Sequence, residues 1–127
     1  MTRPLVLVVD DDPDILDAIC DILEAEGYRV ARARHGGEAL ERIEAERPAL
    51  ILLDLMMPVM DGVSFAQALR ARPAVSDLPI VVISADGNRQ RAAPVGAAGY
   101  LAKPFDIDSL LAHVSRLARP QDAAGAR

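Results

Sequence analysis

The sequence lacks the features that disulfide-stabilised proteins, nucleic-acid-binding proteins, and membrane or secreted proteins require. It contains a single cysteine, so no internal disulfide can form. Its 14 basic residues are outnumbered by 19 acidic ones, and the formal charge of −5 leaves no basic footprint for nucleic acid. The apolar runs are too short for a membrane span or for the core of a signal peptide. We therefore expect a cytoplasmic protein that binds neither nucleic acid nor membranes.

What is present is enough for one domain. A chain of 127 residues with 51% hydrophobic content can build a single core with two helical layers. We place this domain at residues 4–119 and expect a disordered tail of small residues at 120–127. Cys20 lies beside Ile19 and Leu23 on the apolar face of an expected helix, which predicts a buried structural thiol.

Runs of apolar residues predict five short strands. The runs Leu5–Val9, Ala49–Leu53 and Ile80–Ile83 are unbroken, which is typical of central strands covered on both faces. Tyr28–Ala33 has mixed polarity and is expected at an edge of the sheet. Gly99–Ala102 is the fifth expected strand.

Helical segments are expected between and after these strands. Pro13–Glu26 follows Asp12 as N-cap, and Ile107–Leu117 repeats apolar residues at helical spacing after the N-cap Asp106. Five strands alternating with five helical segments, with no hairpin signal, predict parallel βαβ units. The predicted fold class is therefore α/β, a three-layer α/β/α sandwich.

Polar side chains follow four of the strands at the point where each strand ends. Asp10 and Asp11 follow the first strand, Asp54 the third, Ser84 the fourth and Lys103 the fifth. The carboxyl ends of parallel strands meet at one edge of the sheet, where open α/β folds hold ligands, so these residues are expected to cluster. Two carboxylates ~4 Å apart repel each other by about 4 kcal/mol at an effective dielectric near 20. Mg²⁺, with its preference for oxygen ligands, and the charge of Lys103 would offset this repulsion.

Together these motifs resemble the response-regulator receiver domain, the phosphoacceptor module of two-component signalling. The residues that carry the resemblance are the acidic pair Asp10-Asp11, Asp54 within LLDLMMPVMDG, Ser84-Ala85 after IVVI, and Lys103-Pro104-Phe105. The resemblance extends from about Leu5 to Leu117 and implies a CheY-like, flavodoxin-like sheet of five parallel strands in the order 2-1-3-4-5. It also implies a stand-alone response regulator that is not an enzyme and that signals through a changed protein-binding surface.

The resemblance assigns a role to each residue of the expected site. Asp54 would be the phosphoacceptor. Asp10, Asp11 and Asp54 would bind Mg²⁺ together with the backbone carbonyl of Met56. Lys103 would pair with Asp54 or with its phosphate.

Further assignments concern signalling. Ser84 would hydrogen-bond the phosphoryl oxygens and, with Tyr100 turning inward, would act as the switch. The peptide bond between Lys103 and Pro104 is expected to be cis. The phosphoryl donor would be a sensor histidine kinase or a histidine phosphotransfer protein, and the downstream partner an unknown protein. The domain would be a monomer or a phosphorylation-dependent dimer.

Two features depart from the family pattern. Pro94 falls inside the expected fourth helix, where proline costs about 3 kcal/mol, so we expect this helix to be short or broken. Met56 would place an apolar side chain beside the phosphoryl group. We hypothesise that Met56 and Asp86 set the lifetime of that group.

Three alternatives stay open. A degenerate receiver would act as a binding module without phosphorylation, although Asp10, Asp11, Asp54, Ser84 and Lys103 are all retained. A phosphatase of the haloacid dehalogenase type also uses an aspartyl phosphate, but it needs a second acid where this chain has Met56. A flavodoxin-like cofactor carrier would need bare amides and hydroxyls in the first loop, which here is acidic.

Overall fold

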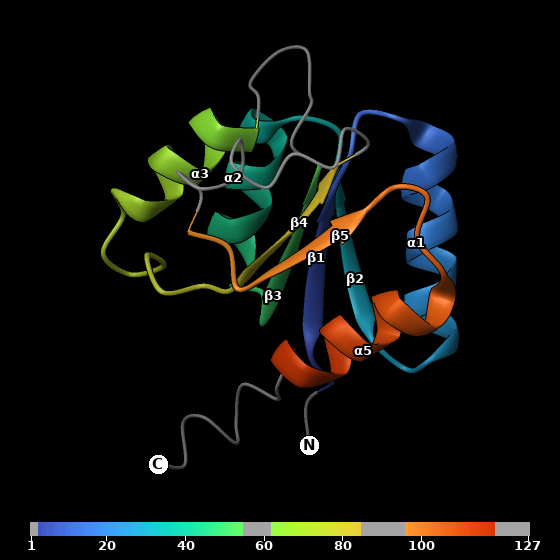
Figure 1. Ribbon diagram of the computed structural model, residues 1–127. Coiled ribbons are helices and arrows are strands. Elements are labelled where there is room, and N and C mark those ends of the chain that lie inside the picture. The colour runs from blue at the N-terminus through green and yellow to red at the C-terminus, as the bar shows by residue number, and fades with distance from the viewer. Residues whose placement is uncertain (1–2, 55–61, 85–95, 119–127) are drawn as a thin grey trace.

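The computed structural model describes residues 3–54, 62–84 and 96–118, in which strands and helices alternate (Figure 1). The strands are β1 (Leu5–Val9), β2 (Arg29–Ala33), β3 (Leu50–Asp54), β4 (Ile80–Ser84) and β5 (Gly99–Ala102). The helices are α1 (Pro13–Ala25), α2 (Gly36–Ala45), α3 (Gly62–Arg70) and α5 (Ile107–Leu117). The expected fourth helix with Pro94 and the expected tail at 120–127 lie outside the described residues.

The five strands form one parallel sheet in the order β2-β1-β3-β4-β5. The α/β prediction and the strand order implied by the resemblance are both confirmed. Every residue of β1, β3 and β4 is buried, because these interior strands have helices against both faces. β2 forms one border of the sheet, and four of its five residues are only partly buried, which agrees with its mixed polarity.

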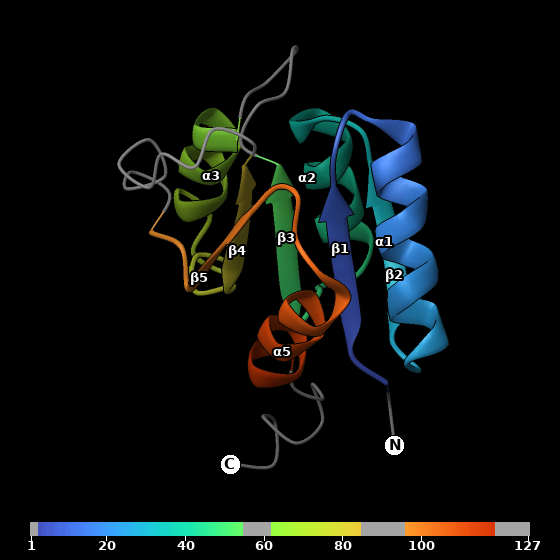
Figure 2. The same ribbon diagram turned by 45° about the vertical axis from the view of Figure 1, so that its right-hand side comes forward.

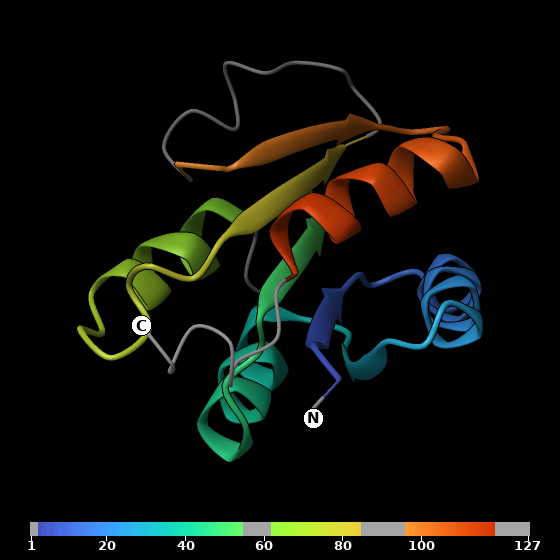
Figure 3. The same cartoon turned by 90° about the horizontal axis from the view of Figure 1, so that it is seen from below.

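Among the described helices, α2 and α3 cover one face of the sheet and α1 and α5 cover the other, as Figures 2 and 3 show. Ile43 of α2 and Phe65 of α3 belong to the apolar core on one face. Leu23 of α1 and Leu110 of α5 belong to the core on the other face. Because successive residues of a strand point to opposite faces, each interior strand contributes to both cores. Because all five strands are parallel, their carboxyl ends lie at one edge of the sheet, between the two cores.

Side chains before three helices accept hydrogen bonds from the first turn. Asp12 Oδ1 accepts from the backbone N–H two residues further on at 2.9 Å, and Asp106 Oδ1 accepts from the N–H three residues on at 2.6 Å. Both residues are the predicted N-caps. His35, which sequence patterns did not single out as a cap, accepts the N–H three residues on through Nδ1 at 3.2 Å and caps α2.

Cys20 is fully buried on α1, as its apolar neighbours predicted. Burial raises the pKa of its thiol to about 11, and the nearby Arg32 guanidinium acts in the opposite direction. Among the described helices, none has both the length and the apolar character that a membrane crossing requires.

Candidate functional site

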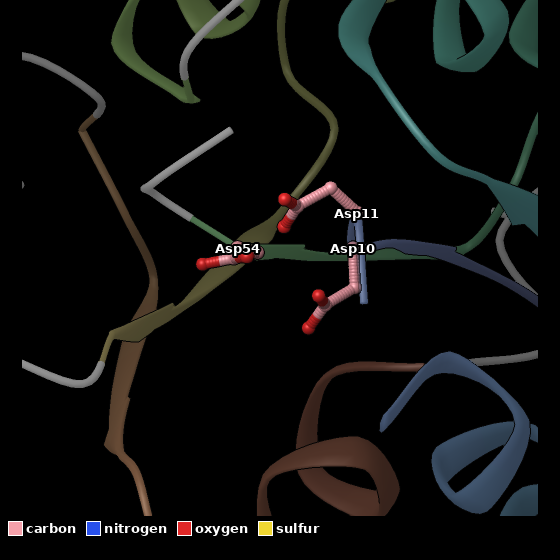
Figure 4. A group of neighbouring side chains, drawn as sticks. All are labelled: Asp10, Asp11 and Asp54. Atoms are coloured by element: carbon pink, nitrogen blue, oxygen red, sulfur yellow. The ribbon is translucent and has the colours of Figure 1, made fainter. Parts of the chain in front are cut away.

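Three carboxylates meet where β1 and β3 end. Asp10 and Asp11 come directly after β1, and Asp54 is the last residue of β3, the strand beside it. One oxygen from each carboxylate lies within 4.8 Å of the others. Figure 4 shows the three side chains gathered at the ends of the two strands. The clustering expected from the strand ends is therefore present in the structure.

The three carboxylates differ in their exposure to solvent. Asp10 is 1% exposed and Asp54 is 4% exposed, whereas Asp11 is exposed. Asp10 and Asp11 are adjacent residues at a strand end and point in opposite directions, so the two carboxylates have different surroundings. Within the described residues, Asp11 is therefore the acid of the cluster whose oxygens are most accessible to a ligand from solvent.

Both oxygens of Asp10 are engaged within the protein. Its Oδ1 accepts the backbone N–H of Asp12 at 2.9 Å, and its Oδ2 accepts a hydrogen bond from Lys103 Nζ at 3.2 Å. The Asp10 backbone N–H also donates to the carbonyl of Ala33, at the end of β2. Asp10 is thus held by the end of β2, by the lysine that follows β5 and by the turn that starts α1.

Lys103 contributes the cation of the cluster. Its Nζ lies 3.7 Å from Asp54 Oδ2, which is further than its 3.2 Å contact with Asp10. The resemblance had implied a pairing with Asp54; the structure adds Asp10 as the nearer partner. The Lys103 backbone N–H donates to the carbonyl of Ser84 at 2.9 Å, which fixes the position of the lysine beside β4. The Lys103–Pro104 peptide bond is cis.

Ser84 and Tyr100, the two residues with an expected switch role, occupy neighbouring strands. Ser84 is fully buried at the end of β4 and pairs with Ala102 of β5. Tyr100 is partly buried and packs against the core that contains Phe65, and its hydroxyl oxygen is buried. The Tyr100 side chain therefore lies inward in this structure. Met56 and Asp86 lie outside the described residues.

The donor atoms of the cluster suit a hard cation. The group offers carboxylate oxygens from Asp10, Asp11 and Asp54, and Mg²⁺ and Ca²⁺ prefer such oxygens over nitrogen or sulfur. Three carboxylates against the single ammonium of Lys103 leave excess negative charge in a mostly buried place. A divalent cation would balance that charge, so the residues present fit such an ion.

The fold and this cluster define a class of phosphoryl-accepting signalling domains, and comparison with known proteins gives the family. Residues 6–115 match the family model of the response regulator receiver domain. The chain is 44% identical over 122 residues to the transcriptional regulatory protein PrrA of Mycobacterium tuberculosis, covering 94% of this chain and 52% of that protein. The protein belongs to the response regulator receiver domain family.

Solved structures agree with this assignment. The chemotaxis protein CheY4 of Vibrio cholerae superposes with a TM-score of 0.86 at 34% identity, covering 91% of this chain and 99% of that one. A response regulator from Chloroflexus aurantiacus gives a TM-score of 0.85 at 34% identity, covering 93% and 100%. The chain spans about half the length of the curated relatives it matches, such as the 52% of PrrA. With the acidic cluster retained, a binding module without phosphorylation is not favoured.

Proposed function

We propose that this receiver domain accepts a phosphoryl group on Asp54. The observation that supports this most directly is the position of Asp54, which lies between the ammonium group of Lys103 and the carboxylates of Asp10 and Asp11. Lys103 Nζ lies 3.7 Å from its Oδ2, and the oxygens of Asp10 and Asp11 lie within 4.8 Å of it. The domain would act as a switch for other proteins, with no reaction on an outside substrate.

The transfer needs a carboxylate held in line with its donor. An Asp54 oxygen forms a bond to the phosphorus of a phosphohistidine, the bond from phosphorus to the histidine nitrogen breaks, and its electron pair stays on that nitrogen. Lys103, whose Nζ is 3.7 Å from Asp54 Oδ2, would stabilise the negative charge that develops on the phosphoryl oxygens. Asp10 holds Lys103 in that position through the 3.2 Å hydrogen bond.

Asp11, Asp54 and the Met56 backbone carbonyl are the groups we propose to hold Mg²⁺, with Asp10 close by. Asp11 suits this role because it is exposed, while the oxygens of Asp10 already accept two hydrogen bonds. When bound, the ion would neutralise charge on the phosphoryl group and on the acids around it. The role of Met56 comes from the family resemblance alone.

A histidine kinase or a phosphotransfer protein is the proposed donor, since receiver domains interact with such proteins. An apolar hollow of about 420 Å³ beside Lys103 supports a protein donor over a small molecule alone. Ile15, Ala18 and Ile22 of α1 line one side of it, and Phe105 lines the other. A contact there would bring a donor histidine to the site edge while its neighbours bury apolar surface.

Ser84 and Tyr100 are the residues we propose to report the phosphorylated state. A phosphoryl group on Asp54 brings new acceptor oxygens near the end of β4, where Ser84 lies. Movement of Ser84 would alter the packing beside β5, which carries Tyr100. The surface around β5 and α5 would then bind a downstream protein with changed affinity.

Incubation with acetyl phosphate and Mg²⁺ tests this function, with intact mass as the measurement. The wild-type protein and the control Asp17→Asn, which changes an exposed acid of α1, should each gain the mass of one phosphoryl group. Asp54→Asn should gain none. Failure of the wild type to gain mass, or equal gain by Asp54→Asn, would contradict the assignment of Asp54.

A further inference from the structure

The outer edge of β2 has no strand partner among the described residues. β2 lies at one end of the strand order and pairs with β1 alone (Figure 1). The N–H of Arg29 donates to Pro4, and the carbonyl of Ala33 accepts from Asp10, so the odd-numbered residues direct their backbone groups toward β1. By alternation, Val30 and Arg32 direct theirs outward. An edge of this kind can pair with another chain.

Arg42 of α2 covers part of this edge. Its Nε donates a hydrogen bond to the carbonyl oxygen of Arg32 at 3.0 Å, which occupies one of the outward acceptors. This contact joins an exposed side chain of the helix to the backbone of the strand. The guanidinium of Arg42 therefore lies where the backbone of an added strand would have to be.

The two arginines of β2 are neutralised within the chain. Arg32 pairs with Asp17 of α1, and Arg29 pairs with Glu46, which follows α2. Arg29 and Arg32 point to opposite faces of the sheet, so there is one ion pair within the chain on each face beside β2. Two copies of this edge could approach each other without an excess of like charge.

The remaining part of the edge borders a hollow of about 540 Å³. Val30 and Ala31 line it from the strand, and Glu24, Ala45 and Arg42 line it from the ends of the two flanking helices. The hollow leaves space beside Val30 for a further backbone, and Arg42 stands at its border.

We propose that the β2 edge can pair with the β2 strand of a second copy of this chain, and that Arg42 holds the edge closed. In an antiparallel pair centred on Ala31, Val30 of each copy faces Arg32 of the other and exchanges two backbone hydrogen bonds with it. Both such pairs use the Arg32 carbonyl that Arg42 occupies. The small side chain of Ala31 permits close approach at the two-fold axis. Arg42 is thus an intramolecular inhibitor of dimer formation.

Sedimentation velocity from micromolar to millimolar protein tests the proposal. Arg42→Ala should sediment as a dimer, with twice the mass of the wild type, at the upper end of this range. The wild type and the matched control Arg72→Ala should stay monomeric. Arg72 is likewise a helix-side arginine that reaches solvent, but it pairs with Glu44 and does not contact β2 in any described hydrogen bond.

A second substitution tests whether the dimer forms through the β2 edge. In the Arg42→Ala background, Val30→Pro removes an outward N–H at a position where an edge strand tolerates proline, and it should restore the monomer. Far-UV circular dichroism checks that each variant is folded. A monomeric Arg42→Ala protein, a dimeric wild type, equal association of Arg72→Ala, or a dimer that persists with Val30→Pro would each overturn the proposal. None of these results depends on phosphorylation of Asp54.

Discussion

Lys103 lies closer to Asp10 than to Asp54: its Nζ is 3.2 Å from Asp10 Oδ2 and 3.7 Å from Asp54 Oδ2. Lys103 and Asp10 follow β5 and β1, which are separated in the sheet by β3 and β4. Asp10 is 1% exposed, so the ammonium group compensates a charge that water does not reach. The lysine is therefore part of the structure of the site as well as of its proposed chemistry.

Replacing Lys103 with methionine should make the stability of the domain depend on Mg²⁺. Removal of one partner of a buried ion pair costs about 3–5 kcal/mol, because the other charge is left uncompensated. A divalent cation would restore part of that compensation. Thermal unfolding with EDTA and with saturating Mg²⁺ measures the effect: Tm of Lys103→Met should rise more on adding Mg²⁺ than Tm of wild type. Arg116→Met, on α5, is the control, and an equal rise in all three proteins would refute the expectation.

Asp11→Asn should weaken Mg²⁺ binding by at least about tenfold, which corresponds to about 1.4 kcal/mol. The substitution keeps the shape of the side chain and removes one carboxylate from the cluster. A titration of Tm with Mg²⁺ gives the affinity, since an ion that binds only the folded state stabilises it. Asp14→Asn changes an acid in the first turn of α1 that does not belong to the cluster, and it should bind as the wild type does. Equal weakening by both would point to general charge rather than to a site.

Cys20 should make the wild type less stable in alkali. Burial raises the pKa of its thiol from 9.0 to about 11, so between these values the unfolded chain releases a proton that the folded one retains. The stabilisation is complete below pH 9 and is lost as pH rises toward 11. From pH 8 to about pH 10.5, the free energy of unfolding should fall on the order of 2 kcal/mol more for wild type than for Cys20→Ala. Urea unfolding measures this, and parallel pH profiles would show that the thiol does not contribute.

Gly99→Ala should destabilise the domain by about 1–3 kcal/mol through overpacking. A Cβ at position 99 would lie 2.8 Å from Cδ2 of His113, whose ring packs on β5 from α5. His113→Ala removes that ring, so it should cancel most of the penalty in the double variant. Urea unfolding of the four proteins of the cycle gives the interaction energy. Additive effects of the two substitutions would mean that the steric contact is not the cause.

The interior of the sheet was predictable because burial on both faces demands unbroken apolar runs. β1, β3 and β4 were expected on that ground and are buried throughout. Boundaries were less accurate: Tyr28 was expected in the second strand, but its N–H donates to the Leu23 carbonyl at the end of α1, so β2 begins one residue later. The strand order came from the family resemblance, because parallel units of similar length do not determine it.

The gathering of acids at one edge was also predictable, since parallel strands leave their carboxyl ends together. The shorter distance from Lys103 to Asp10 than to Asp54 was not predictable, because it depends on the conformations of three side chains that come from three different strand ends. The different exposure of Asp10 and Asp11 likewise needed coordinates. The packing of the His113 ring over Gly99, which leaves that side chain partly buried, also needed coordinates.

Lys103 is the only lysine of the chain; the other basic residues apart from the two histidines are all arginines. Protein made with isotope-labelled lysine would therefore show one side-chain ammonium resonance, and that resonance would come from the atom beside Asp10 and Asp54. The molecule thus carries its own spectroscopic reporter. Binding of a cation, or a change of charge on either acid, could be followed there without attaching a label.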